Sequence, residues 1–159
     1  GLIILAAGES ARMGKPKQLL QFKGETLLRR AAQTAINSAC DWVVAVLGAN
    51  AESLEKELSD LNLEIAFNKD WKTGMSSSIK AGLEKFLEKN RDLQAVVITV
   101  CDQPFVSAEI IDDLIEKHLE TNALIVASRY AETLGVPALF DKKLFPGLEK
   151  LKKKGGAKN

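Results

Sequence analysis

Apolar residues gather in five short, almost continuous runs, and longer stretches with a helical period separate these runs. Continuous apolar runs are typical of strands covered on both faces of a sheet. The predicted strands are Leu2–Leu5, Trp42–Leu47, Leu63–Phe67, Ala95–Val100 and Leu124–Ser128, and the predicted helices are Glu25–Ser38, Ala51–Leu61, Ser77–Lys89 and Ala108–Thr121. This alternation indicates βαβ units and therefore a three-layer α/β/α, Rossmann-like domain with a mainly parallel sheet.

Two helix starts carry residues that favour N-terminal capping. Ser107 precedes the helix with the clearest apolar stripe, and Glu109 lies in its first turn, where a negative charge is stabilising. Asn50 is expected to cap the helix that begins at Ala51 in the same way. Ligands of such sheets bind beyond the carboxyl ends of the strands, near the switch in strand order, so the loops that follow the strands are the candidate sites.

Length and composition narrow the class of protein. The chain has 159 residues, 46% of them hydrophobic and 27% charged, which fits a single globular domain over residues 1–159. Its 22 basic and 21 acidic side chains argue against a nucleic-acid partner, and no apolar run is long enough to span a membrane. Two cysteines favour a reduced, cytoplasmic location. We expect a monomer or a weak oligomer, and a chain trimmed from a longer protein.

The loop after the first predicted strand is suited to binding a triphosphate. The small residues at positions 6–8 let a ligand approach the backbone, whose N–H groups can line an anion site. Arg12, Lys15 and Lys17 add three cations close behind, and guanidinium and ammonium groups both bind phosphate oxygens. The alternative is a solvated turn with ordinary surface charges.

Two common nucleotide motifs are absent from this loop. The P-loop pattern GxxxxGK[ST] fails because Gly8 and Gly14 enclose five residues and Lys15 precedes Pro16. The pattern GxGxxG is missing as well, which argues against an NAD site of the Rossmann type.

The segment Leu5–Leu20, LAAGESARMGKPKQLL, resembles without a gap the signature LAAGxSxRMGxPKxLL of molybdenum-cofactor-type nucleotidyltransferases. The resemblance implies transfer of a nucleoside monophosphate from a nucleoside triphosphate to an acceptor phosphate, with release of pyrophosphate. It further implies that the loop wraps the triphosphate and that Lys17 contacts the α-phosphate. The loop residues so implied are Leu5, Ala6, Ala7, Gly8 and Arg12.

A second candidate site follows the predicted strand Ala95–Val100. Asp102 would lie at the carboxyl end of that strand, facing the first loop, where a carboxylate is well placed to hold Mg²⁺. Taken alone, an aspartate that caps a turn before Pro104 is an equally good interpretation. The sequence CDQP at 101–104 resembles the magnesium site of the same family. The resemblance therefore implies a catalytic set of Lys17, Arg12 and Asp102. Cys101 is expected to be only a small buried residue.

Two weaker similarities concern the base and the acceptor. The segment 68–78 resembles the family pattern NxxWxxGMxSS, which implies that Asn68, Ser76 and Ser77 contact the nucleotide, although serines before a helix also serve as caps. The acceptor pocket is expected to involve Arg129, Gly135 and Pro137. Molybdopterin cytidylyltransferases usually carry the sequence Gly-His-Pro where this chain has Gly135-Val136-Pro137.

The resemblance favours CTP over GTP because Ala7 and Pro16 match family members that use CTP. A side chain at position 7 also narrows the space for a purine. The implied acceptor is molybdopterin or the molybdenum cofactor. Two alternatives stay open: a nucleotidylyltransferase or cytidylyltransferase for another small phosphate, and a non-catalytic nucleotide-binding domain.

Overall fold

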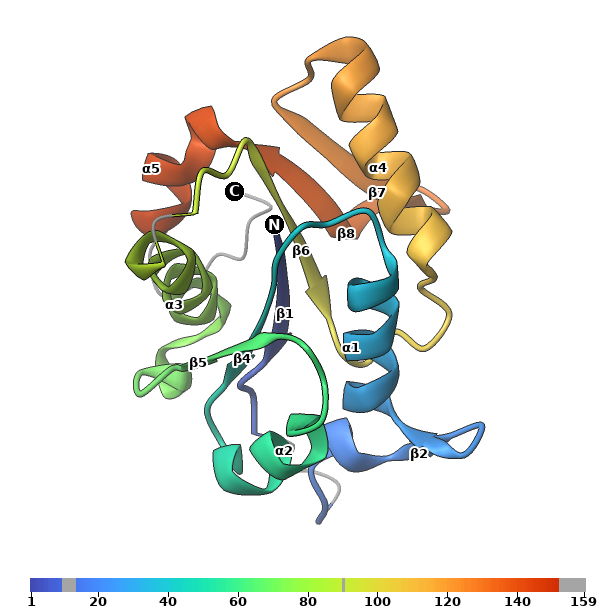
Figure 1. The fold of residues 1–159 in the computed structure, drawn as a ribbon, viewed down its shortest axis with the longest axis vertical. Coiled ribbons are helices and arrows are strands. Elements are labelled where there is room, and N and C mark those ends of the chain that lie inside the picture. The colour runs from blue at the N-terminus through green and yellow to red at the C-terminus, as the bar shows by residue number, and fades with distance from the viewer. Residues whose placement is uncertain (10–13, 90, 152–159) are drawn as a thin grey trace.

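A six-stranded sheet forms the centre of the computed structural model, which describes residues 1–9, 14–89 and 91–151 (Figure 1). The strand order is β5-β4-β1-β6-β8-β7. The strands are β1 (Leu2–Ala6), β4 (Val43–Leu47), β5 (Glu64–Phe67), β6 (Ala95–Val100), β7 (Ile125–Tyr130) and β8 (Thr133–Asp141). The first four are parallel, whereas β8 pairs antiparallel with both β6 and β7. The predicted mainly parallel sheet is confirmed.

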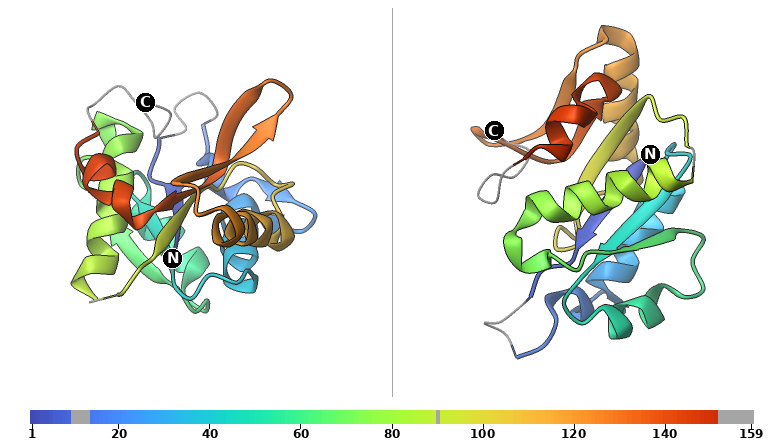
Figure 2. Two further views of the ribbon diagram at one scale, coloured as in Figure 1. Left: turned by 90° about the horizontal axis from the view of Figure 1, so that it is seen from above. Right: turned by 90° about the vertical axis from the view of Figure 1, so that its left-hand side faces the viewer.

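Helices cover both faces of this sheet, so the molecule has the expected three layers (Figures 1 and 2). One layer contains α1 (Leu27–Asn37), α2 (Ala51–Leu58) and α4 (Ala108–Thr121), and the other contains α3 (Met75–Glu88) and α5 (Phe145–Glu149). Side chains of β1 alternate between the two layers, with Ile4 packed toward α1 and Ile3 toward α3. Burial on both faces explains why the predicted strands lack alternating polar residues. None of the helices in the described part of the chain is long and apolar enough to cross a membrane.

A short hairpin replaces the expected start of the first helix. Strands β2 (Gln21–Phe22) and β3 (Glu25–Thr26) pair antiparallel, and the helix predicted from Glu25 begins at Leu27. The Thr26 hydroxyl accepts a hydrogen bond from the N–H of Arg29 at 3.1 Å, so Thr26 is the N-cap. The prediction placed two residues too many at the start of the helix, because a capping threonine does not interrupt a helical pattern, and one too many at its end, where Ser38 is the C-cap.

The two predicted caps differ in outcome. The Ser107 hydroxyl accepts from the N–H of Ile110 at 3.4 Å, which confirms its role at the start of α4. Asn50 does stand before α2, but its side chain makes no capping bond, so that prediction is wrong. Its backbone has a φ of 57°, a left-handed conformation that asparagine tolerates better than most residues.

The sequence pattern did not predict one strand of the sheet, β8. Residues 124–128 predicted a fifth strand, and β7 does start at Ile125, but β8 lies between it and β6. Gly135 and Pro137 stand within β8, and both residues are typical strand breakers. This explains why its pattern did not predict a strand.

Close packing between α3 and β1 leads to a first prediction. A Cβ at Gly82 would lie 2.8 Å from two side-chain atoms of the fully buried Ile3. Gly82→Ala should therefore lower the free energy of unfolding by about 1–3 kcal/mol, as overpacking does, despite the better helix propensity of alanine. Urea denaturation measures the change.

The matched control is Gly147→Ala in α5, where nothing lies within 4 Å of the added carbon. This variant should be neutral or slightly more stable than the parent. Equal effects of the two substitutions would contradict the packing described for Ile3.

Candidate functional site

The candidate site is a cavity of about 310 Å³ at the carboxyl ends of the parallel strands. After β1 the chain proceeds outward to β4 and β5, and then returns to β6 on the other side of β1. The connections therefore diverge between β1 and β6, and such a switch point leaves a crevice where α/β proteins bind ligands. The lining residues are Leu5, Ala6, Ala7, Gly8, Glu9, Lys17, Gln18, Trp71, Gly74, Met75, Ser78, Val100, Cys101 and Asp102.

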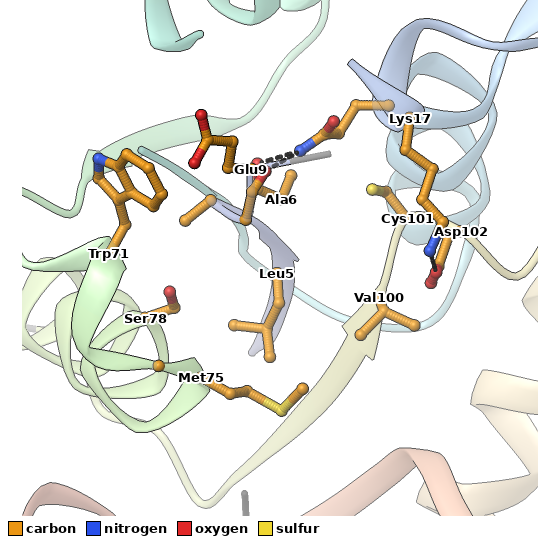
Figure 3. Close-up of a pocket in the computed structure, with 14 residues that line it drawn as sticks. Leu5, Ala6, Glu9, Lys17, Trp71, Met75, Ser78, Val100, Cys101 and Asp102 are labelled. Atoms are coloured by element: carbon orange, nitrogen blue, oxygen red, sulfur yellow. Dashed lines mark hydrogen bonds and ion pairs between the residues drawn. The ribbon is translucent and has the colours of Figure 1, made fainter. Parts of the chain in front are cut away.

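An ion pair between Lys17 and Asp102 forms one side of the cavity (Figure 3). Lys17 begins the short 3-10 helix Lys17–Leu19, and Asp102 directly follows the strand that ends at Val100. The hydrogen bond and the charge of Asp102 raise the pKa of Lys17 above its usual value. Lys17 is therefore a cation throughout the neutral range. The structure thus brings together two members of the predicted catalytic set, and the third, Arg12, lies outside the described residues.

Gln18 holds the backbone of the small-residue loop. Its side chain is 4% exposed, and its Nε2 donates to the carbonyl oxygens of Ala6 and Gly8, both at 2.9 Å. The carbonyl between them, that of Ala7, accepts from the N–H of Ala49 at 3.0 Å. Three successive carbonyls of the loop after β1 are thus bound by the protein itself. Sequence reasoning did not select Gln18, because one glutamine between Lys17 and Leu19 carries no periodic signal.

Trp71 forms part of the wall across from the ion pair, together with Met75 and Ser78 (Figure 3). A Cβ at Gly48 would lie 2.7 Å from the Cβ of Trp71 and 2.8 Å from the carbonyl oxygen of Ala7. Glycine at position 48 is therefore what allows Trp71 and the loop to pack so closely. The Met75 side chain remains 47% exposed at the cavity.

The other predicted nucleotide contacts in this region hold the segment between β5 and α3 in place. Asn68 is buried, and its Nδ2 donates to the hydroxyls of Ser77 at 2.8 Å and Ser78 at 3.0 Å. Its Oδ1 accepts from the N–H of Asp70 at 2.9 Å. Neither Asn68 nor Ser76 nor Ser77 is among the cavity-lining residues. Their contact with a nucleotide stays a prediction.

The carboxylates that line the cavity are the groups that could hold a metal ion. Among the residues that the structure describes, no cluster of three or more His, Cys, Asp or Glu could hold a metal ion by itself. The cavity does contain Asp102 and Glu9, a residue that the prediction of a basic loop passed over. Mg²⁺ is usually held by one or two carboxylates together with substrate phosphates and water. The residues therefore fit a metal that arrives with a triphosphate.

The three predicted acceptor residues lie on the β7–β8 hairpin and do not line this cavity. Arg129 is exposed on β7 and its Nε donates to the carbonyl of Ala131 at 3.0 Å. Strand β8 runs antiparallel to β6, with Ala138 beside Ile98. Gly135 and Pro137 consequently lie on the side of Ala138 toward the edge where β6 ends. Their role in binding an acceptor stays a prediction.

The whole chain is similar to a known family of transferases. The family of MobA-like NTP transferase domains matches residues 2–159, and the chain belongs to this family, as the first loop predicted. Among solved structures, Rv0371c from Mycobacterium tuberculosis H37Rv superposes with a TM-score of 0.83 at 26% identity, covering 95% of this chain and 75% of that one. A homologue from Mycobacterium sp. strain JC1 has the same TM-score at 30% identity, covering 98% of this chain and 76% of that chain. A further structure of Rv0371c, at 24% identity, is a complex with manganese.

Characterised relatives carry different names. The chain is 39% identical over 117 residues to nicotine blue oxidoreductase of Paenarthrobacter nicotinovorans, covering 73% of this chain and 55% of the relative's length. It is 30% identical over 160 residues to a probable molybdenum cofactor guanylyltransferase of Methanosarcina mazei, covering 96% of this chain and 68% of the relative. The presence of a guanylyltransferase among the relatives means that the family likeness does not favour CTP.

Cys101 leads to a prediction about reactivity. It is 6% exposed, as expected for a small buried residue, and burial together with the charge of Asp102 raises its pKa to about 12. A raised pKa lowers the thiolate fraction at every pH below it. At pH 8 iodoacetamide should therefore alkylate Cys101 in the folded protein on the order of 10³-fold more slowly than in the protein unfolded by urea. Peptide mapping separates Cys101 from Cys40. Similar rates in the folded and unfolded protein would contradict this.

Proposed function

We propose that this chain transfers a nucleoside monophosphate from a nucleoside triphosphate to the phosphate of a small acceptor, and releases pyrophosphate. The observation that carries the proposal is the Lys17–Asp102 pair, which stands beside the loop of small residues at the switch point of the sheet. A cation, a carboxylate and a closely approachable backbone are the groups that a metal-bound triphosphate requires. The family of NTP transferase domains to which the chain belongs supports the same reaction.

In this reaction an oxygen of the acceptor phosphate attacks the α-phosphorus in line. The bond from the α-phosphorus to the oxygen that bridges to the β-phosphate breaks, and pyrophosphate leaves with that oxygen. Lys17 stabilises the charge on the α-phosphate, while Arg12 and the N–H groups of residues 6–8 hold the β- and γ-phosphates. Asp102, with Glu9 nearby, would hold Mg²⁺, which neutralises phosphate charge when bound. Positioning and charge stabilisation are the main contributions of the protein to such a transfer.

The Lys17–Asp102 pair gives the site a balanced charge before the nucleotide binds. Lys17 is 47% exposed and Asp102 is 32% exposed, so both groups can exchange partners without leaving a buried charge behind. Asp102 would hold Mg²⁺ through its carboxylate, and Lys17 would bind a phosphate oxygen through its ammonium group, so each group would keep a partner of opposite charge.

Substitutions of Lys17 and Asp102 test the proposed reaction. Lys17→Ala and Asp102→Asn should each lower kcat by roughly 10²–10³-fold, the cost of losing one preorganised electrostatic contact. Neither should change the free energy of unfolding by more than about 1 kcal/mol, because exposed ion pairs contribute little to stability. Pyrophosphate release and thermal denaturation give the two readings. A large loss of stability with normal kcat would make the pair structural.

We propose CTP as the preferred nucleotide. The support is local. Ala7 lines the cavity, and its carbonyl lies against Gly48 and accepts from the N–H of Ala49, so this part of the wall has little freedom to recede for a purine. Titration with CTP and GTP in the presence of Mg²⁺, followed by the fluorescence of Trp71, measures the choice. Trp42→Phe removes the second tryptophan, which lies over Arg91 and not at this cavity. Tighter binding of GTP would reverse the assignment.

The proposed acceptor is molybdopterin or the molybdenum cofactor, bound near Arg129, Gly135 and Pro137. The likeness to a probable molybdenum cofactor guanylyltransferase supports an acceptor of this class. The decisive assay measures pyrophosphate release from each of the four nucleoside triphosphates with Mg²⁺, with and without molybdopterin. Release with a different phosphorylated acceptor only would retain the transferase and replace the acceptor.

One similarity favours a second function. The 39% identity to nicotine blue oxidoreductase supports a redox reaction on the same fold. A change in the absorbance of nicotine blue when the chain and a reductant are added, together with no pyrophosphate release, would favour that function. Nucleotide binding with neither reaction would identify a non-catalytic nucleotide-binding domain.

A further inference from the structure

We infer that Gln18 is a positioning residue, which sets the direction of the backbone N–H groups that bind the triphosphate. This inference rests on the proposed function, because it concerns the phosphate end of the same site. Gln18 is among the few buried polar side chains of the described structure, and it lines the cavity between the loop and Lys17. Its role follows from the geometry of the peptide bond.

In a trans peptide the C=O and the following N–H point in opposite directions. The carbonyl of Ala6 is bound by Gln18, which directs the N–H of Ala7 away from the Gln18 amide. The carbonyl of Gly8 is bound by the same Nε2, so the N–H of Glu9 also points away from the Gln18 amide. One side chain therefore orients two peptide planes of the loop. The plane between them, whose carbonyl belongs to Ala7, is oriented by the N–H of Ala49 at 3.0 Å.

This arrangement matters because carbonyl oxygens repel an anion. Gly8 has no Cβ and restricts the backbone weakly, so the peptide planes beside it could rotate. A rotated plane would present an oxygen to the phosphates in place of an N–H. The two 2.9 Å bonds from Gln18, a residue that is only 4% exposed, oppose that rotation.

The amide is also the appropriate chemical group for this position. Two carbonyl oxygens require a donor with two hydrogens on one atom, which the NH₂ group of glutamine supplies. A carboxylate of the same shape has no hydrogen to donate and would repel both carbonyls. A methionine side chain has a similar length, carries no charge and cannot donate.

The test compares Gln18→Met and Gln18→Glu with Gln21→Glu, the same charge change at an exposed residue of β2. The probe is inorganic triphosphate with Mg²⁺, whose binding depends on neither the base nor the acceptor. We expect affinity to fall about 10-fold in Gln18→Met and about 100-fold in Gln18→Glu, and to stay unchanged in Gln21→Glu. With nucleotide as substrate, KM should rise more than kcat falls, because the loop binds the phosphates in the ground state as well.

The outcomes separate this inference from the proposed function. If the unsubstituted protein binds neither inorganic triphosphate nor nucleotide, the proposed function fails. If it binds triphosphate and both Gln18 variants bind it equally well, the positioning role fails while the function stands. A lower melting temperature with unchanged triphosphate affinity, measured well below melting, would make Gln18 a purely structural residue. If Gln18→Glu does not fold, the comparison of Gln18→Met with the unsubstituted protein decides.

Discussion

The site depends on how firmly β1 is held. This strand has β4 on one side and β6 on the other, and its side chains are buried in both layers of helices. Its carboxyl end therefore has a fixed position, and the three carbonyls that follow are bound by Gln18 and Ala49. A loop of small residues would otherwise be the most mobile kind of backbone. Here the sheet, the amide of Gln18 and the neighbouring loop restrict it, so that the loop keeps both close access and a defined shape.

Two opposite charges of the site are paired with each other in the folded chain. Lys17 and Asp102 come from different elements, the 3-10 helix after the first loop and the end of β6. The cation thus faces a carboxylate in the folded chain. Under the proposed function, a triphosphate would take the place of the carboxylate beside Lys17, and Mg²⁺ would take the place of the ammonium beside Asp102.

Much of this arrangement could be predicted from the sequence, because the relevant signals are local or periodic. The apolar run at Ala95–Val100 has the same bounds as β6, and the stripe after Ser107 has the same bounds as α4. The loop after β1 and the position of Asp102 follow directly from those strands. Features that depend on distant contacts had no such signal: β8 is a strand despite Gly135 and Pro137 because β7 pairs with it before and after these residues, and β6 pairs with it from Ala138 onward. Gln18 is similar, since its importance lies in carbonyls that only the folded chain brings within 2.9 Å.

The positions of these features also explain why family likeness points to a reaction before it points to an acceptor. The side of the cavity that holds Lys17 and Asp102 is built around the ends of β1 and β6, which are parts of the parallel sheet itself. The predicted acceptor residues belong to the antiparallel hairpin β7–β8, which joins the sheet at its edge and has Tyr130 and Leu134 exposed near its turn. A hairpin at the edge of a sheet can change without disturbing the central strands. Relatives can therefore share the central sheet and carry names as different as guanylyltransferase and oxidoreductase.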